Sequence, residues 1–172
     1  MPNTVPDSPD DTATFEFSNK TGVSLSASTT VNGIVFNAGA SAFTITARPT
    51  EGFTLIIDGV GITNNSGIAQ NFVVGAGAFT PTIFRNTATA GNDDTHFTIN
   101  GAPNRKTNGG FLIFEDSSSA GSATFTVEGA MNKNGGSLSF GASSSAGNAT
   151  LIVRPSPTNT TRGFRRRQHL LF

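Results

Sequence analysis

The sequence lacks three residue types that often carry chemistry or recognition. Among its 172 residues there is no cysteine, no tryptophan and no tyrosine. The absence of cysteine excludes disulfides, thiolate zinc sites and cysteine nucleophiles together. The absence of tryptophan and tyrosine removes the usual platform on which sugars stack. Only 13% of the residues are charged, so the chain is also poor in titratable groups.

Long apolar runs are missing as well. No stretch approaches the roughly 18 apolar residues that a membrane-spanning helix needs, so we expect no direct insertion of this segment into a membrane. Met1 is followed directly by Pro2, Asn3 and Thr4, which form no signal peptide. We therefore expect an expressed piece, or a truncated reading frame, of a longer secreted precursor. The lack of cysteine is compatible with a bacterial protein that is exported and folds outside the cell.

The formal net charge is zero, but the charges are unevenly distributed. Four of the eleven basic residues lie in the last eleven positions, as Arg162, Arg165, Arg166 and Arg167. Residues 1–161 hold seven Lys or Arg against eleven Asp or Glu, a balance of −4. Nucleic-acid binding needs a basic face, so we expect no nucleic-acid partner.

Glycine and phenylalanine are abundant, with 20 and 15 copies. Short runs in which apolar and polar residues alternate are separated by Gly, Asn, Ser and Thr, which predicts β-strands and tight turns and no helix. One such turn is expected at Asp58-Gly59. The strands are expected at residues 12–17, 23–27, 34–36, 43–46, 55–57, 70–74, 82–84, 97–99, 111–114, 123–127, 138–140 and 149–153.

Three stretches repeat one phrase of residues. Each starts with a short apolar run and continues into a polar turn, at residues 83–91, 109–124 and 135–150. Phe84, Phe114 and Phe140 hold equivalent places, 30 and 26 residues apart. A sandwich has no need to repeat its turns residue by residue, whereas a solenoid gains from it. We therefore predict an all-β fold, a single-domain parallel β-helix over residues 12–161 with coils of about 22–30 residues.

Equivalent residues of successive coils stack about 4.8 Å apart in such a fold. Two interior ladders are expected, Phe84 with Phe114 and Phe140, and Phe97 with Phe125 and Leu151. Polar ladders are expected at the turns, Asn86 with Asp116, and Thr89 with Ser119 and Ser145. The repeated glycines are expected at positions that need a positive φ or no side chain: Gly91, Gly121 and Gly147.

Several of these stretches resemble a known family. They are Val5 to Phe15 (VPDSPDDTATF), Thr29 to Asn37 (TTVNGIVFN), Gly59 to Phe72 (GVGITNNSGIAQNF) and the Ser-Ser-Ala-Gly-Asn-Ala-Thr phrase. In this order they resemble the autotransporter-associated β-strand repeats of bacterial surface proteins, over nearly all of Val5–Val153. The resemblance implies a right-handed parallel β-helix in an exported passenger or stalk region, generally without a catalytic site. It also implies an extracellular or cell-surface location.

The two ends of the chain differ from the repeats. Residues 1–11 hold three prolines and three aspartates and are expected to form an extended lead-in. Residues 162–172 have no counterpart in the earlier coils. Codons CGG CGG CGG CAG CAT CTC CTT would encode Arg165 to Leu171, and a shift of one nucleotide gives Gly-Gly-Gly-Ser-Ile-Ser, the opening of another coil. We hypothesise that this irregular tail is the out-of-frame end of a longer repeat gene, which the coding DNA tests. The alternative is a basic tail that binds an acidic partner.

Candidate chemistry is limited to a few titratable residues. Parallel β-helices include polysaccharide lyases and hydrolases, and a glycosidase needs two facing carboxylates. The candidates are Asp93, Asp94, Glu115 and Asp116, with His96 nearby, and Asp93-Asp94 also offers oxygen ligands for Ca²⁺. Acidic turn residues more simply keep a sheet-rich surface soluble, and His96 fits an outward strand position. Phosphate-binding, HExxH and dinucleotide motifs are absent, so we predict no catalytic, cofactor or metal site.

These observations lead to one expected function and two alternatives. We expect a non-catalytic structural or interaction segment of an exported surface protein, which spaces or displays other parts. Because both ends of a solenoid leave backbone N–H and C=O groups unpaired, we also expect self-association end to end, besides a surface glycan or protein as a further partner. The alternatives are a carbohydrate-binding or carbohydrate-cleaving β-helix and a self-assembling extracellular fibre subunit.

Overall fold

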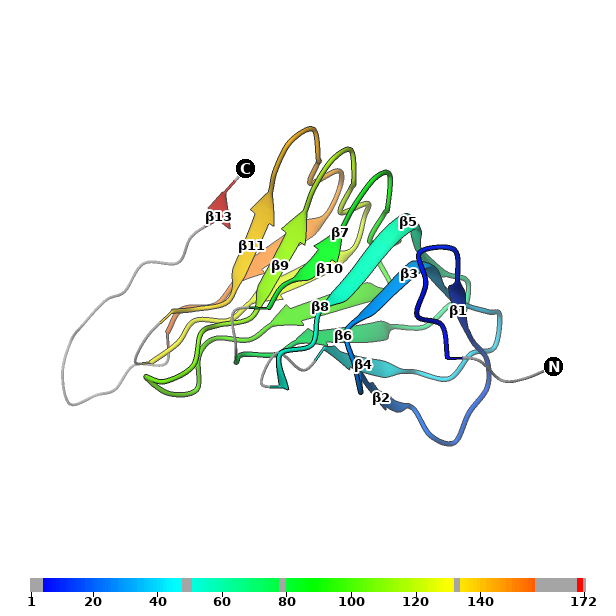
Figure 1. Ribbon diagram of the computed structural model, residues 1–172, viewed down its shortest axis with the longest axis horizontal. Helices are drawn as coiled ribbons and strands as arrows, with labels where there is room; N and C mark the ends of the chain where they lie inside the picture. The colour runs from blue at the N-terminus through cyan, green and yellow to red at the C-terminus, as the bar shows by residue number, and fades with distance from the viewer. Residues whose placement is uncertain (1–4, 48–50, 78–79, 132–133, 157–169, 172) are drawn as a thin grey trace.

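The chain forms a parallel β-solenoid. The computed structural model describes residues 5–47, 51–77, 80–131, 134–156 and 170–171. Successive strands alternate between two sheets, and every strand pair is parallel. The coils follow one another along the long axis of the molecule (Figure 1). Within the described ranges there is no α-helix, and no helix that is long and apolar enough to cross a membrane. The predicted fold class is confirmed.

The two sheets take alternate strands of the chain. Sheet A has seven: β1 (Thr12–Phe15), β3 (Thr29–Phe36), β5 (Leu55–Asn64), β7 (Thr82–Phe84), β9 (Phe111–Phe114), β11 (Ser137–Phe140) and β13 (Leu170–Leu171). Sheet B has six: β2 (Gly22–Ser24), β4 (Thr44–Ala47), β6 (Gln70–Val74), β8 (Thr95–Ile99), β10 (Thr124–Val127) and β12 (Thr150–Val153). Register partners in sheet B lie between 22 residues (Gly22 and Thr44) and 28 residues (His96 and Thr124) apart, within the predicted coil length.

A short third side connects sheet A to sheet B in each coil. In the early coils this side is a strand segment. Strand β1 pairs with Gly33–Phe36, which is the second half of β3, and this half of β3 pairs in turn with the second half of β5. In the later coils it narrows to single-residue parallel bridges, which join Gly61, Thr89, Ser119 and Ser145 in turn. We name the bend before this side the first corner and the bend after it the second corner.

The turn predicted at Asp58-Gly59 is wrong, since both residues lie inside β5. The chain bends there without ending the strand, because β5 carries extra residues between its pairings with Val31 and Gly33. This bulge turns the strand from sheet A onto the third side. A Cβ atom on Gly59 would lie 2.0 Å from Asn32 Oδ1 and 3.0 Å from Asn32 O, so a larger residue here would require the Asn32 side chain to move.

The core contains stacked phenylalanine rings among aliphatic side chains, and the predicted ladders are present. Phe114 lies 4.7 Å from Phe84 and 5.0 Å from Phe140 between ring centroids, in a stacked geometry. A second stack joins Phe97 to Phe125 at 4.9 Å, and Phe125 is the register partner of Leu151. The two stacks meet edge to face, at 5.8 Å between Phe114 and Phe125. Edge-to-face and offset geometries are those that aromatic quadrupoles favour, so each ring is held by its own stack and by the facing one.

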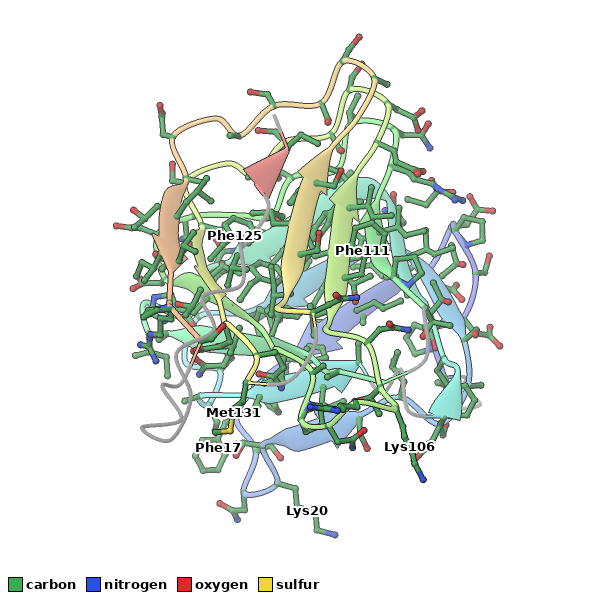
Figure 2. All side chains as sticks on the ribbon, turned by 90° about the vertical axis from the view of Figure 1, so that its left-hand side faces the viewer. Phe17, Lys20, Lys106, Phe111, Phe125 and Met131 are labelled. Carbon is green, nitrogen blue, oxygen red and sulfur yellow. The ribbon has the colours of Figure 1, made fainter. Side chains whose placement is uncertain are left out.

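Element bounds agree with the sequence in the later coils and differ at the ends. The strands at 70–74, 82–84 and 111–114 are confirmed as predicted. The first strand ends at Phe15, not at residue 17, and Phe17 is 77% exposed. Phe17 projects away from the sheets (Figure 2). In the tail, residues 162–169 and 172 lie outside the described residues, and Leu170–Leu171 pair in parallel with Leu138 and Ser139.

Candidate functional site

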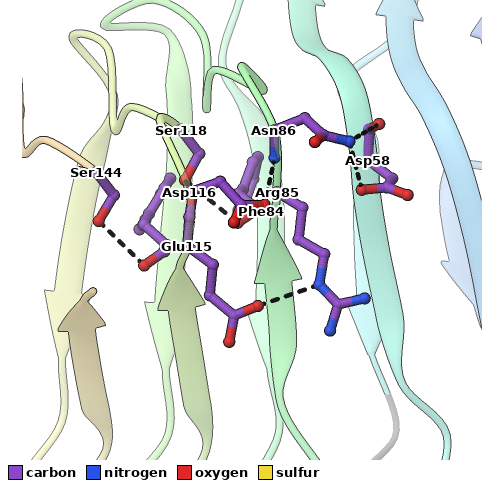
Figure 3. Close-up of polar contacts among 9 residues, drawn as sticks. Asp58, Phe84, Arg85, Asn86, Glu115, Asp116, Ser118 and Ser144 are labelled. Atoms are coloured by element: carbon purple, nitrogen blue, oxygen red, sulfur yellow. Dashed lines mark hydrogen bonds and ion pairs between the residues drawn. The ribbon is translucent and has the colours of Figure 1, made fainter. Parts of the chain in front are cut away.

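The first corner holds a column of residues in the left-handed conformation. Asn86, Asp116 and Ala142 occupy equivalent positions in three coils, with φ of 53°, 55° and 53°. The backbone N–H of Asn86 donates to Asp116 Oδ2 at 3.0 Å, and its Nδ2 donates to Asp58 Oδ1 at 3.0 Å (Figure 3). Asn and Asp tolerate this conformation better than other L-residues. The predicted Asn86–Asp116 ladder is confirmed, and it connects three coils.

The middle serine of the repeated phrase binds backbone carbonyls at the same corner. Ser118 Oγ donates to Glu115 O at 2.6 Å and to Phe84 O of the preceding coil at 3.2 Å. Ser144 repeats both contacts one coil later, to Gly141 O at 2.6 Å and Phe114 O at 3.1 Å. Each hydroxyl therefore connects its own corner to the end of the sheet-A strand of the coil before.

The last serine of the phrase stabilises the second corner. The hydroxyl oxygens of Thr89, Ser119 and Ser145 accept hydrogen bonds from the amide of the residue two positions later, at 3.2, 3.1 and 3.0 Å. Those residues are the repeated glycines, with φ of 97°, 60° and 55°: Gly91, Gly121 and Gly147. A Cβ atom on Gly121 would lie 2.3 Å from Gly91 O. Both the positive φ and the lack of space require glycine, as predicted.

The acidic candidates lie at two different corners. Glu115 and Asp116 follow β9 at the first corner, where Glu115 Oε2 pairs with Arg85 Nε at 3.1 Å. Both of these side chains are about 40% exposed, so the pair contributes about 0–1 kcal/mol to stability. Asp93 and Asp94 follow Gly91 at the second corner, and Asp94 O accepts the Gln70 N–H at 2.8 Å.

This arrangement does not assemble a site from the acidic candidates. Within the described part of the chain, no group of three or more His, Asp or Glu residues is placed to hold a metal ion. His96 Nε2 lies 3.1 Å from the backbone oxygen of Asp93, on the outer face of sheet B between the buried Thr95 and Phe97. The expected outward orientation of His96 is therefore confirmed.

The outer face of sheet B carries several hydroxyl groups. Its strands present one column of polar side chains in register, which contains three threonines, one asparagine and one histidine: Thr44, Asn71, His96, Thr124 and Thr150. All five are at least partly exposed. Outward threonine fits the pleated surface of a sheet through its branched side chain, so this face needs no ligand to explain it.

Sequence analysis missed one buried polar cluster. Gln70 is fully buried, and its Oε1 accepts the Phe43 N–H at 2.8 Å. Its Nε2 donates to Ser41 O at 3.1 Å and Ser66 Oγ at 3.0 Å. The alternation of residues 70–74 places Gln70 on the inward side, and a glutamine at such a position indicates a bonded interior amide. Every bond of the cluster is made within the protein, so its role is structural.

Comparisons with known proteins add no relative. No protein-family model, no curated protein and no solved structure matches the chain. The repeat register and the hydrogen bonds at the corners are therefore the basis for a functional proposal.

Proposed function

We propose that the chain is a non-catalytic structural segment of an exported bacterial surface protein, comparable to an autotransporter passenger or stalk. The observation that carries this proposal is the use of the repeated polar residues. Ser118 and Ser144 bind backbone carbonyls of their own and the preceding coil, while Ser119 and Ser145 hold the glycine corner. The repeated phrase thus serves coil-on-coil stacking, which is what a scaffold requires.

The proposed role is to space or display other parts of a surface protein. Each added coil lengthens the solenoid by about 4.8 Å and covers the apolar end of the coil before it. The open ends allow a second copy to stack on the first. The resemblance of Val5–Val153 to autotransporter-associated repeats supports the cell-surface location, and the lack of cysteine agrees with it.

Surface labelling of the producing bacterium tests the location. Antibodies raised against the purified chain should label intact cells, and protease added to those cells should remove the label. An antibody against a cytoplasmic protein controls for leakage. Label that appears only after the cells are opened would contradict the proposal.

Insertion of one coil tests the scaffold mechanism. A second copy of residues 115–140, placed after Phe140, should add one strand to each sheet because the inserted segment restores the same register. Small-angle scattering should show a maximum dimension longer by about 4.8 Å, with an unchanged circular dichroism spectrum per residue. A loss of β-structure, or an unchanged length, would contradict it. Binding on a glycan array or loss of viscosity of a polyuronate solution would favour the carbohydrate alternative instead.

A further inference from the structure

Sheet B is open at both ends of the solenoid. Among the described strands, β2 is its first and β12 its last, so each has a neighbour on one side alone. The two ends lie at opposite ends of the long axis (Figure 1). Ile152 and Val153 in β12 are 41% and 37% exposed, whereas Val127, the partner of Val153 one coil earlier, is 1% exposed. The open edge of β12 is therefore apolar as well as unpaired.

The free backbone groups of the two edges match. In a parallel strand, alternate residues bond to opposite neighbours. Thr150 and Arg154 donate their N–H groups inward to β10, so Leu151 and Val153 direct theirs to the open edge. At the other end, Leu25 donates to Thr46 of β4, so Ser24 faces outward.

We propose that β12 of one chain pairs in parallel with β2 of a second copy, head to tail, so that sheet B continues across the joint. If the sheet-B register continues across the joint, Val23 of the second copy lies beside Leu151 of the first, and Ser24 of the second copy lies beside Ile152. The Val23–Leu151 contact extends the interior column that contains Phe97 and Phe125. This inference rests on the scaffold role proposed above and specifies how two copies join.

The charges at the two ends favour this orientation. Residues 1–20 contain four carboxylates and one lysine, whereas residues 154–172 contain five arginines and no carboxylate. In a head-to-tail chain the acidic N-terminal sequence of one copy follows the arginine-rich C-terminal sequence of another, whereas a contact between two identical ends joins sequences of like charge. The association should therefore weaken as salt is raised. A heterologous contact of this kind does not close on itself, so it forms chains of copies and not closed dimers.

Sheet A accommodates the same joint. Its last strand, β13, pairs with β11 through two residues only, and at the first coil Asp11 O accepts the Asn32 N–H at 2.7 Å. Residues 8–11 form a turn closed by Asp11 N–H to Ser8 O at 2.9 Å, and in the joint this acidic turn of the second copy lies at the end of sheet A from which β13 is displaced. The short β13 pairing is thus exchanged for pairing along β2 and β12.

Two proline variants block one edge each. Ser24→Pro and Val153→Pro remove outward N–H groups and leave the bonds within the chain, because proline is tolerated at an edge strand. Ser24→Thr and Val153→Thr are the matched controls that keep the N–H group. Circular dichroism and thermal unfolding should show that all four variants fold like the original chain.

Sedimentation velocity over a roughly hundred-fold range of protein concentration measures whether the chains associate. The original chain and both threonine controls should form species of increasing mass, whereas each proline variant alone should stay at the mass of one chain. An equimolar mixture of the two proline variants should reach the mass of two chains and stop there. A monomeric original chain, a block by one of the two prolines only, or a mixture that stays monomeric would overturn the proposal.

Cysteine cross-linking provides a measurement that does not depend on proline. The chain has no cysteine, so Ser24→Cys combined with Ile152→Cys places one thiol on each edge, at a strand spacing that suits a disulfide. Oxidation should give a ladder of covalent multimers, and each single variant should give none. A dimer from Ile152→Cys alone would instead show a contact between two identical ends. None of these outcomes bears on the surface labelling that tests the scaffold role, so the two proposals fail separately.

Discussion

Thr82 is a polar residue in an apolar column, and its replacement by valine should stabilise the protein. It lies in β7 between the register partners Leu55 and Leu112 and is 3% exposed. Its Oγ1 is buried and has no hydrogen-bond partner among the described residues. Valine has the same branched shape and replaces the hydroxyl with a methyl group, so the change removes the unpaired group without overfilling the core.

The expected gain follows from two contributions. A buried hydroxyl without a partner costs about 1–3 kcal/mol, and the added methyl contact contributes about 0.8 kcal/mol. Since the surrounding column is already close-packed, we expect Thr82→Val to raise the free energy of unfolding by about 2 kcal/mol. For a chain of this size that corresponds to a rise in Tm of about 5 °C.

Urea unfolding at equilibrium measures this change, with the slope of the transition checked for constancy. The matched control is Thr95→Val, because Thr95 is also fully buried but its Oγ1 is hydrogen-bonded to Asn92 Oδ1 at 3.3 Å. The control should lose about 1 kcal/mol. If both variants shift the midpoint in the same direction, or if Thr82→Val lowers it, the unpaired hydroxyl does not destabilise the column as argued.

Three further predictions concern the corners and the core, and each is measured by the urea midpoint. Ala142→Gly should stabilise the folded protein by about 0.5 kcal/mol. Alanine in the left-handed conformation at φ 53° is strained by about 1–2 kcal/mol, and the relief of this strain exceeds the extra unfolded-state entropy that glycine brings. A lower urea midpoint would refute this. Ser118→Ala should cost about 1 kcal/mol through its two lost hydrogen bonds, whereas Ala88→Ser, at the equivalent position one coil earlier, should be neutral or stabilising. Phe114→Ala should cost about 3–5 kcal/mol and Phe140→Ala less, because Phe114 is fully buried whereas Phe140 is only partly buried; equal losses would contradict the burial argument.

The parts of the fold that the sequence predicts are those that repeat with little variation. The spacing of Phe84, Phe114 and Phe140 defines the register of sheet A, because a shift by one residue would turn every ring outward. Gly91 and its two equivalents are predictable for a similar reason, since a glycine that returns at one turn position indicates a backbone requirement. The separation of Asp93 from Glu115 could not be read from the sequence, because it depends on which corner of the coil each residue occupies.

Other features depend on contacts that no local pattern contains. Ala142 occupies the left-handed position of the first corner, and alanine gives no indication of that conformation; alignment with Asn86 and Asp116 is needed to find it. The bend in β5 has the turn-forming pair Asp58-Gly59, but pairing with the bulged edge of β3 keeps these residues in the strand. Tertiary pairing overrides local turn preference here.

The distribution of the repeated phrase along the chain follows from the width of the third side. In the early coils this side is a strand ladder, with β1 and the second halves of β3 and β5 bonded to one another, and the serine-rich phrase is absent from those coils. Where the ladder narrows to single bridges at Thr89, Ser119 and Ser145, backbone hydrogen bonds between coils continue on that side, such as Ser119 N–H to Ala88 O and Ala90 N–H to Ser119 O, both at 2.9 Å. The side-chain bonds of the phrase appear in those same coils, on both sides of the bridge. The phrase therefore adds hydroxyl hydrogen bonds and left-handed glycine corners to the backbone bonds of a narrower third side.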